Sequence, residues 1–163
     1  MSTASVNPVP EGYHTVTPSL IVDDAAAAID FYQQAFDAVE LMRLPMETAD
    51  GRPKIGHAEL KIGDSRLMLA DEFPEMEAMG PKSRGGATAS FMIYVPDVDA
   101  AVQQALDAGA TADGQIADQF WGDRTGAVID PFGHRWTLAT HVQDVPEDEM
   151  KERMKAWSRE QNS

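Results

Sequence analysis

An internal repeat is the feature that most constrains how this chain can fold. The junction Val22-x-Asp24 recurs as Val95-x-Asp97, and QQAFDA at 33–38 recurs as QQALDA at 103–108. The offsets, 73 and 70 residues, differ by about one helical turn. The junction is the more informative match, because alanine-rich helices resemble one another by chance. A period of this length predicts two similar modules in tandem.

Hydrophobic periodicity gives both modules the order β-α-β-β-β. Pro18 removes one ladder hydrogen bond, so the first strand is expected at a sheet edge or with a bulge. The proline- and glycine-rich segment 71–87 is predicted to be a linker or a lid. The expected elements are a strand at 14–22, a helix at 25–36 capped by Asp23 or Asp24, strands at 39–46, 54–62 and 66–70, a strand at 90–95, a helix at 97–108, a short strand at 110–115 and a hairpin at 119–140.

The hairpin segment QFWGDRTGAVIDPFGHRWTLAT holds two of the three tryptophans. Trp136 is interpreted as a core residue. Trp121 is interpreted either as core or as the wall of a cavity, because an indole buries a large area at low entropic cost. The segment therefore predicts both a fold anchor and a candidate binding surface.

The composition of the chain limits which kinds of partner it can bind. The chain has 163 residues, 43% hydrophobic content and no cysteine, which predicts one domain with a real core and no disulfide framework. Its formal net charge of −14 disfavours nucleic acid and anionic membranes as partners. The first residues lack the pattern of a signal peptide, and no apolar run suits a membrane span, so we expect a cytoplasmic protein.

Residues 144–157 predict an amphipathic helix that Asp144 caps. Met150, Met154 and Trp157 form a narrow apolar stripe on it. Such a stripe is typical of a helix that docks on its own domain or on a partner subunit.

Four stretches together resemble a known family: SLIVDDAAAAIDFYQQAF, HAELKIGDSRLMLAD, VPDVDAAVQQALDAGAT and DQFWGDRTGAVIDPFGHRW, within Tyr13 to about His141. They are similar to the vicinal-oxygen-chelate superfamily of glyoxalases, bleomycin-resistance proteins and dioxygenases, and especially to its PhnB-like branch, which the tail's PEDEMKERM also resembles. The resemblance implies an α+β fold of two βαβββ modules, with mixed sheets curled around a cavity, in a homodimer. The implied divisions are an arm at 1–12, one domain at 13–142 (modules 13–70 and 88–142, loop 71–87) and a helical tail at 143–163.

The resemblance also locates the four positions that hold a divalent metal in the family's enzymes. Here they are Thr17, Met68, Ser90 and Thr137. Two kinds of hydroxyl and a thioether are poor ligands for such ions, so we expect neither a metal nor another cofactor. An alternative set pairs His57 with Glu59, with His134 or His14 as a third ligand.

If the four positions face the cavity, strand alternation places Ser19, Ala70, Met92, Tyr94 and Ala139 on the same face and Phe91, Ile93, Trp136 and Leu138 under the helices. Trp121 and Arg124 are expected at the cavity mouth, where Arg124 would bind a ligand carboxylate.

The leading hypothesis is metal-free binding of a small, partly aromatic molecule. The alternatives are a lyase, isomerase or dioxygenase-like enzyme with displaced ligands, and a structural dimer. No catalytic residue is identified. The candidate ligand-binding residues are Thr17, Ser19, His57, Glu59, Met68, Ser90, Met92, Tyr94, Trp121, Arg124 and Thr137.

Overall fold

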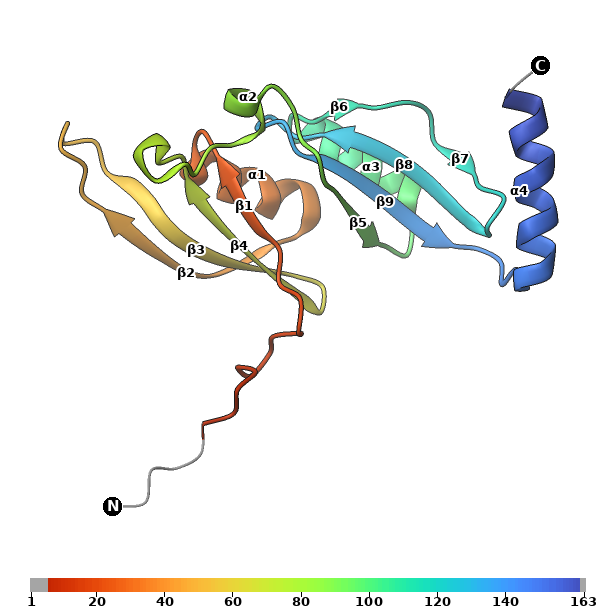
Figure 1. Ribbon diagram of the computed structural model, residues 1–163, viewed down its shortest axis with the longest axis horizontal. Helices are drawn as coiled ribbons and strands as arrows, with labels where there is room; N and C mark the ends of the chain where they lie inside the picture. The colour runs from red at the N-terminus through yellow and green to blue at the C-terminus, as the bar shows by residue number, and fades with distance from the viewer. Residues whose placement is uncertain (1–5, 162–163) are drawn as a thin grey trace. The chain divides into compact units, whose positions relative to one another are not determined.

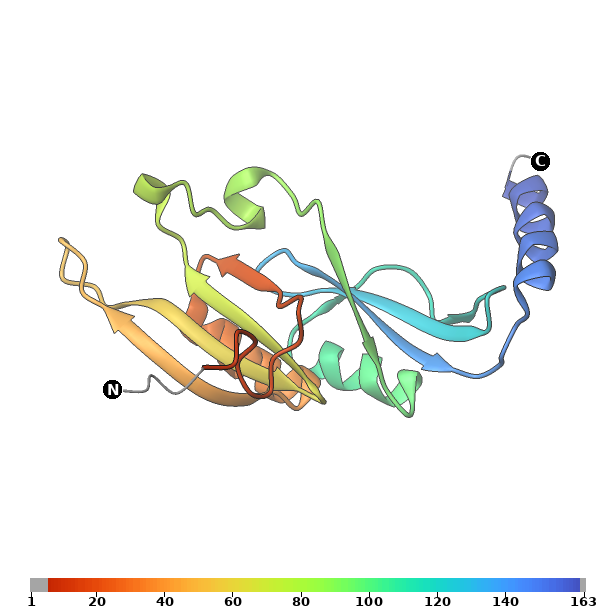
Figure 2. The same ribbon diagram turned by 60° about the horizontal axis from the view of Figure 1, so that its bottom comes forward.

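The computed structural model of the protein describes residues 6–161 (Figures 1 and 2). The chain forms two compact units that divide between Gly86 and Ala87. This boundary lies at the end of the 71–87 segment, where the sequence predicts a linker. Residues 1–5 of the predicted arm and 162–163 of the predicted tail lie outside the described residues.

The first unit is a four-stranded mixed sheet with one long helix packed on it (Figure 1). The strand order is β1-β4-β3-β2, with β1 parallel to β4 and the other neighbours antiparallel. Leu20, Leu60 and Leu69 are almost fully buried in its core. Its elements are β1 (Ser19–Val22), α1 (Ala25–Phe36), β2 (Val39–Met46), β3 (Lys54–Ile62), β4 (Ser65–Asp71), the 3-10 helix η1 (Pro74–Met76) and α2 (Pro81–Arg84).

The second unit repeats this plan. Its strand order is β5-β9-β8-β6, with β7 also paired to β8 and with β5 parallel to β9. The helix α3 packs on β8 and β9, over the buried side chains of Trp136 and Leu138. Its elements are β5 (Ser90–Tyr94), α3 (Val98–Asp107), β6 (Thr111–Ala112), β7 (Ala117–Asp118), β8 (Asp123–Ile129), β9 (Arg135–His141) and α4 (Glu147–Gln161).

The long helix of each unit starts with the same two contacts, which confirms the repeat. Asp24 and Asp97 each accept a hydrogen bond from the backbone N–H three residues on, at 2.9 and 3.1 Å. Asp71 in β4 and Thr140 in β9 each accept the N–H of the first helical residue, at 2.7 and 2.9 Å. Both contacts satisfy donors that a helix cannot pair internally. The repeated junction in the sequence is therefore a repeated capping device.

The strand register confirms the predicted alternation within each unit. Met68 lies opposite Ser19, Met92 lies opposite Thr137, and Tyr94 lies opposite Ala139. We call the side of each sheet that faces away from its long helix the open face. The open faces carry the predicted candidate residues of the strands except Arg124, whereas the helix-covered faces carry most of the buried core.

Three expectations about the elements need correction. The first strand begins at Ser19 rather than at residue 14, because Pro18 has no N–H to donate; β1 does lie at a sheet edge, as predicted. The segment 71–87 contains η1 and α2, each with a proline in its first turn, a favoured position. The strand β7 was not predicted.

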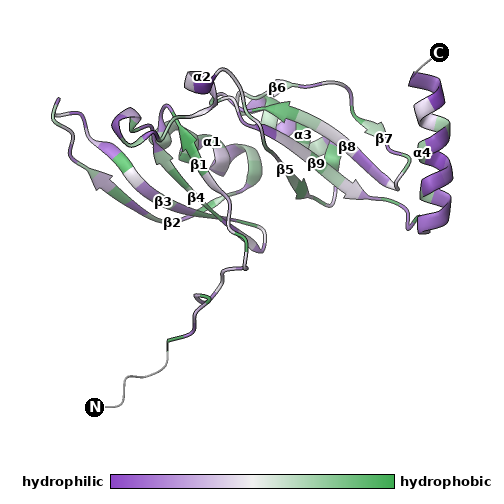
Figure 3. Ribbon diagram, viewed as in Figure 1, coloured by the Kyte–Doolittle hydropathy of each residue, from purple (hydrophilic) through white to green (hydrophobic). Residues whose placement is uncertain are grey.

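The tail helix α4 is only partly docked, and none of its described residues is buried. Arg153 Nη1 donates to the backbone oxygen of Phe120 at 3.2 Å, and the Trp157 ring lies 6.1 Å from the Phe120 ring. Met154 and Trp157 stay 48% and 47% exposed. Figure 3 shows α4 as mostly hydrophilic. The predicted apolar stripe therefore contacts its own unit but leaves much apolar surface uncovered.

Candidate functional site

The four positions that the resemblance implies for metal binding fall at the open faces. In the first unit, Met68 donates its N–H to the backbone oxygen of Pro18 at 2.9 Å, which brings the neighbouring Thr17 alongside β4. In the second unit, Ser90 and Thr137 lie on the adjacent strands β5 and β9. Within each unit, the two predicted positions therefore lie on neighbouring segments.

The side chains at these positions do not fit a divalent metal. Neutral hydroxyl and thioether groups supply no charge to a hard or borderline cation. In addition, Arg135 Nη1 donates to Thr137 Oγ1 at 3.1 Å. A guanidinium at this distance repels a second cation and occupies a lone pair of the hydroxyl.

The alternative metal pair, His57 and Glu59, is present but lacks a third ligand. His57 Nε2 lies 3.3 Å from Glu59 Oε1, and Arg66 Nη1 lies 3.7 Å from Glu59 Oε2. Among residues 6–161, no three His, Cys, Asp or Glu side chains gather in a way that could hold a metal ion. The two residues instead form a polar pair on the open face of the first unit.

Tyr13 extends this polar pair. Its ring lies under the Arg66 guanidinium, 4.5 Å from ring centroid to Cζ, a cation–π geometry. Its hydroxyl is buried without a hydrogen bond of good geometry; burial and the nearby Glu59 carboxylate raise the pKa of Tyr13. The Tyr13 hydroxyl, His57 and Arg66 lower the pKa of Glu59, so three neighbouring side chains favour its ionised form.

A second polar cluster, centred on Asp123, lies on the open face of the second unit. Asp123 is 3% exposed, and its carboxylate accepts three side-chain hydrogen bonds. The donors are the Tyr94 hydroxyl at 2.9 Å, Trp121 Nε1 at 3.1 Å and His141 Nδ1 at 2.7 Å. These groups come from β5, the hairpin tip and β9, so one buried carboxylate orients side chains from three segments.

His141 lies between two carboxylates. Its Nδ1 is 2.7 Å from Asp123 Oδ1, and its Nε2 is 3.0 Å from Asp144 Oδ1. A carboxylate can only accept, so these two contacts favour the imidazolium form, in which both ring nitrogens carry a proton. Hydrogen bonds to Asp144 and then to Asp123 raise the pKa of His141. Burial raises the pKa of Asp123, but the hydrogen bonds from His141, Tyr94 and Trp121 outweigh it, so this pKa is lowered overall.

One expectation about this region needs correction. Asp144 was predicted to cap the tail helix, but α4 begins at Glu147, so Asp144 lies outside the N-cap position and instead contacts His141.

Arg124 lies on the other side of β8. It is paired with Thr140, whereas Asp123 is paired with His141, so the two neighbours project to opposite faces. The Arg124 guanidinium binds Asp99 at 2.7 and 2.9 Å and Asp118 at 3.0 Å. Ligand binding by Arg124 would require these ion pairs to break.

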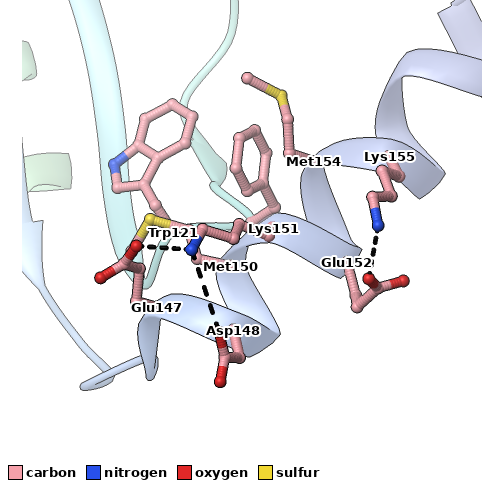
Figure 4. A pocket seen from close by; sticks show the side chains of 9 residues that line it. Trp121, Glu147, Asp148, Met150, Lys151, Glu152, Met154 and Lys155 are labelled. Atoms are coloured by element: carbon pink, nitrogen blue, oxygen red, sulfur yellow. Dashed lines mark hydrogen bonds and ion pairs between the residues drawn. The ribbon is translucent and has the colours of Figure 1, made fainter.

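Trp121 and α4 border an open groove of about 850 Å³ (Figure 4). Trp121, Phe120, Met150 and Met154 supply its apolar walls. Its remaining lining residues are charged: Glu147, Asp148, Lys151, Glu152 and Lys155. Lys151 lies 2.6 Å from Glu147 and Lys155 lies 2.7 Å from Glu152, so these cations are already paired within α4.

The other predicted binding residues of the second unit are accessible. Tyr94 is 61% exposed and Met92 is 49% exposed, and Ser90 is exposed beside them on β5. They form an apolar strip next to the Asp123 cluster. His134, which was named as a possible third metal ligand, is a buried turn residue whose backbone N–H donates to Asp130 at 2.9 Å.

Sequence reasoning missed the Asp123 and His141 pair, although a signal for it exists. The turn between β8 and β9 places Ile129 opposite Arg135. Continuing that antiparallel register to the ends of both strands places Asp123 opposite His141.

Two successive units of the βαβββ type, each with a mixed sheet and a helix on one face, define a two-module α+β protein. A sequence model of the Glyoxalase/Bleomycin resistance protein/Dioxygenase superfamily matches residues 13–138. The chain belongs to this superfamily.

Relatives of the chain carry little functional description. An uncharacterized protein of Mycobacterium bovis is 49% identical over 142 residues, which cover 85% of this chain and 91% of the relative. The crystal structure of a gene product from Arabidopsis thaliana is 26% identical with a TM-score of 0.61, covering 78% of this chain and 98% of the other. The structure of TioX from Micromonospora sp. ML1 is 26% identical with a TM-score of 0.60, covering 79% and 99%.

Among the helices that the structure describes, none combines the length and the apolar character that crossing a bilayer would need.

Proposed function

We propose that this chain is a PhnB-like member of the superfamily that binds a small, partly aromatic molecule without a metal. One observation carries the proposal: the positions that would hold the metal bear Thr17, Met68, Ser90 and Thr137, and Arg135 donates a hydrogen bond to Thr137. A guanidinium and hydroxyls are suited to direct hydrogen bonding with a ligand rather than to metal-mediated chemistry.

The open face of the second unit supports this proposal. Tyr94 and Met92 present an aromatic ring and a thioether side by side, with hydroxyls from Ser90 and Thr137 nearby. A mainly apolar lining with a few placed polar groups is typical of small-molecule sites.

A homodimer is part of the proposal. Five hydrophobic residues of the edge strand β2 are 37–56% exposed: Val39, Leu41, Met42, Leu44 and Met46. An apolar edge strand is normally covered, because its unpaired backbone groups and side chains otherwise attract other chains. A second copy related by a two-fold axis would cover it.

Native mass spectrometry and elemental analysis of the purified protein test this function. We expect a dimer of the 17.8 kDa chain with no stoichiometric divalent metal, and a bound or bindable aromatic molecule. About one tightly held zinc, nickel, manganese or iron per chain would contradict the proposal, and His57→Ala with Glu59→Ala would then identify its ligands.

A matched control restores the missing donors. Two paired variants, Thr17→His with Met68→Glu and Ser90→His with Thr137→Glu, each supply one imidazole and one carboxylate within a single unit; the second pair also carries Arg135→Gln, which removes the guanidinium beside residue 137. We expect each paired variant to bind zinc more tightly than the parent does. If neither gains affinity for zinc, the assignment of these positions is wrong.

A further inference from the structure

We infer that His141 is the anchor for a carboxylate of the ligand, and that Asp144 occupies this place in the ligand-free chain. The inference rests on the proposed binding function and adds to it the ligand-facing cation and the chemical class of the ligand. It also moves the predicted carboxylate contact from Arg124 to His141.

The anchor is rigidly oriented from one side. His141 Nδ1 is held at 2.7 Å by Asp123, and Asp123 is itself fixed by Tyr94 and Trp121. This network fixes the direction in which the Nε2–H of His141 points. A preorganised donor of this kind loses little freedom when a ligand binds.

The group on the other side is easily displaced. The Asp144 side chain is fully exposed, whereas the His141 side chain is 51% exposed. Asp144 lies in the irregular segment between β9 and α4. Exposed ion pairs of this type hold weakly. The Asp144 contact also demonstrates that a carboxylate reaches Nε2 with good hydrogen-bond geometry, at 3.0 Å.

The surroundings favour an aromatic acid. The exposed ring of Tyr94 joins the same network through Asp123, and Met92 lies two residues before it on the same open face. In a chain of net charge −14, an anion is repelled except beside a fixed cation. Arg124 faces the opposite side of β8 and binds two aspartates. The other cation on this face, Arg135, lies at the opposite end of β9, where it is bound by Asp113 at 2.6 Å and donates to Thr137. His141 is the cation that shares the Asp123 network with Tyr94, and an anion can reach it by displacing one exposed side chain, Asp144.

The ligand carboxylate and Asp144 then compete for the hydrogen bond from His141 Nε2–H. Removing the Asp144 carboxylate leaves His141 Nε2–H free for the ligand and should raise the affinity for a carboxylate about two- to fivefold, the range that an exposed pair supports. Removing the imidazolium should weaken carboxylate binding about tenfold or more, because a charge-assisted hydrogen bond is lost.

The test uses biphenyl-4-carboxylate and its neutral isostere biphenyl-4-carboxamide, titrated at pH 6.5 into the full chain by calorimetry and by ¹H–¹⁵N NMR. The variants are His141→Gln, Asp144→Asn and, as the control of equal charge change, Asp23→Asn, which is exposed and ion-paired with Lys82 in the first unit. We expect Asp144→Asn to tighten the carboxylate and Asp23→Asn to leave it unchanged. We expect His141→Gln to weaken the carboxylate but not the carboxamide.

The outcomes separate the inference from the proposed function. If both probes bind the parent but His141→Gln binds the carboxylate as tightly, or Asp144→Asn and Asp23→Asn behave alike, the anchor is not His141 while aromatic binding stands. If neither probe binds the parent or Asp144→Asn, both the inference and the proposed aromatic binding are wrong.

Discussion

Replacing Asp123 by asparagine changes the charge and one hydrogen-bonding atom of the buried cluster while keeping its shape. All three partners of the Asp123 carboxylate are donors: Oδ2 accepts from Tyr94 and Trp121, and Oδ1 accepts from His141. An amide has one oxygen and one NH₂ group. Whichever way the asparagine is turned, its NH₂ group meets at least one donor.

The smallest cost arises when the amide oxygen faces Tyr94 and Trp121. The NH₂ group then meets His141 Nδ1, which can accept only after the ring loses its proton. One charge-assisted hydrogen bond, worth about 1.5 to 3 kcal/mol, is lost. We expect the free energy of unfolding at pH 6 to fall by about 2 kcal/mol and the pKa of His141 to fall back toward its ordinary value.

Urea unfolding followed by circular dichroism gives the first quantity, and an NMR titration of the histidine ring protons gives the second, with His141→Gln assigning the His141 signal. Asp118→Asn is the control, because this carboxylate is 74% exposed and its loss should cost less than about 1 kcal/mol. A change in the unfolding free energy below about 0.5 kcal/mol, with an unchanged His141 pKa, would refute the reasoning.

Three further predictions concern stability. Gly122→Ala should cost at least about 2 kcal/mol, because φ is +99° and the new Cβ would collide with the Gln143 carbonyl oxygen; in Gly51→Ala, where φ is +75° with no atom within 4 Å, urea unfolding should show a smaller loss. Asp71→Ala should cost about 3 kcal/mol by leaving two buried backbone donors unpaired, and equal stability of Asp71→Ala and Asp23→Ala would contradict this. The stability that His141 contributes should be fully present below its ordinary pKa of 6.5 and disappear as pH rises through its raised folded pKa; melting curves of His141→Gln should lack this slope.

The sequence predicted most of the fold because its local signals agree with the tertiary contacts. The repeated Asp24 and Asp97 junctions form real caps, and the period-two pattern of Trp136 and Leu138 matches their burial under α3. The errors lie where the sequence offers competing signals. Pro18 lies within an alternating run, and the strand begins only after it, at Ser19. The prolines of the 71–87 segment stand in the first turns of short helices.

The candidate site was predictable in part. Alternation placed Met92 and Tyr94 on the open face correctly. Thr137 lies on the open face and pairs with Ala127, so Ala127 lies on that face too. Alternation along β8 from Ala127 then places Arg124 on the helix-covered face. The prediction that Arg124 lies at the cavity mouth therefore did not follow from the pattern. The partner of Asp144 could not be predicted from the sequence. His141 lies three residues before Asp144 and the first helical residue, Glu147, lies three residues after it, so spacing alone cannot decide between an imidazole contact and a helix cap.

The position of Asp144 has a consequence for the tail. Val142 and Gln143, which connect it to His141, both donate their N–H groups to the Gly122 oxygen at 2.9 Å, and α4 begins three residues beyond Asp144. A ligand that displaces Asp144 therefore loosens one of the few contacts that fix the start of α4. Coupling of this kind is reciprocal. A protein that binds α4 and moves Asp144 away from His141 would raise the affinity for the ligand. The ligand would raise the affinity for that protein by the same factor. Binding at the tail helix would therefore regulate how fully the ligand site is occupied.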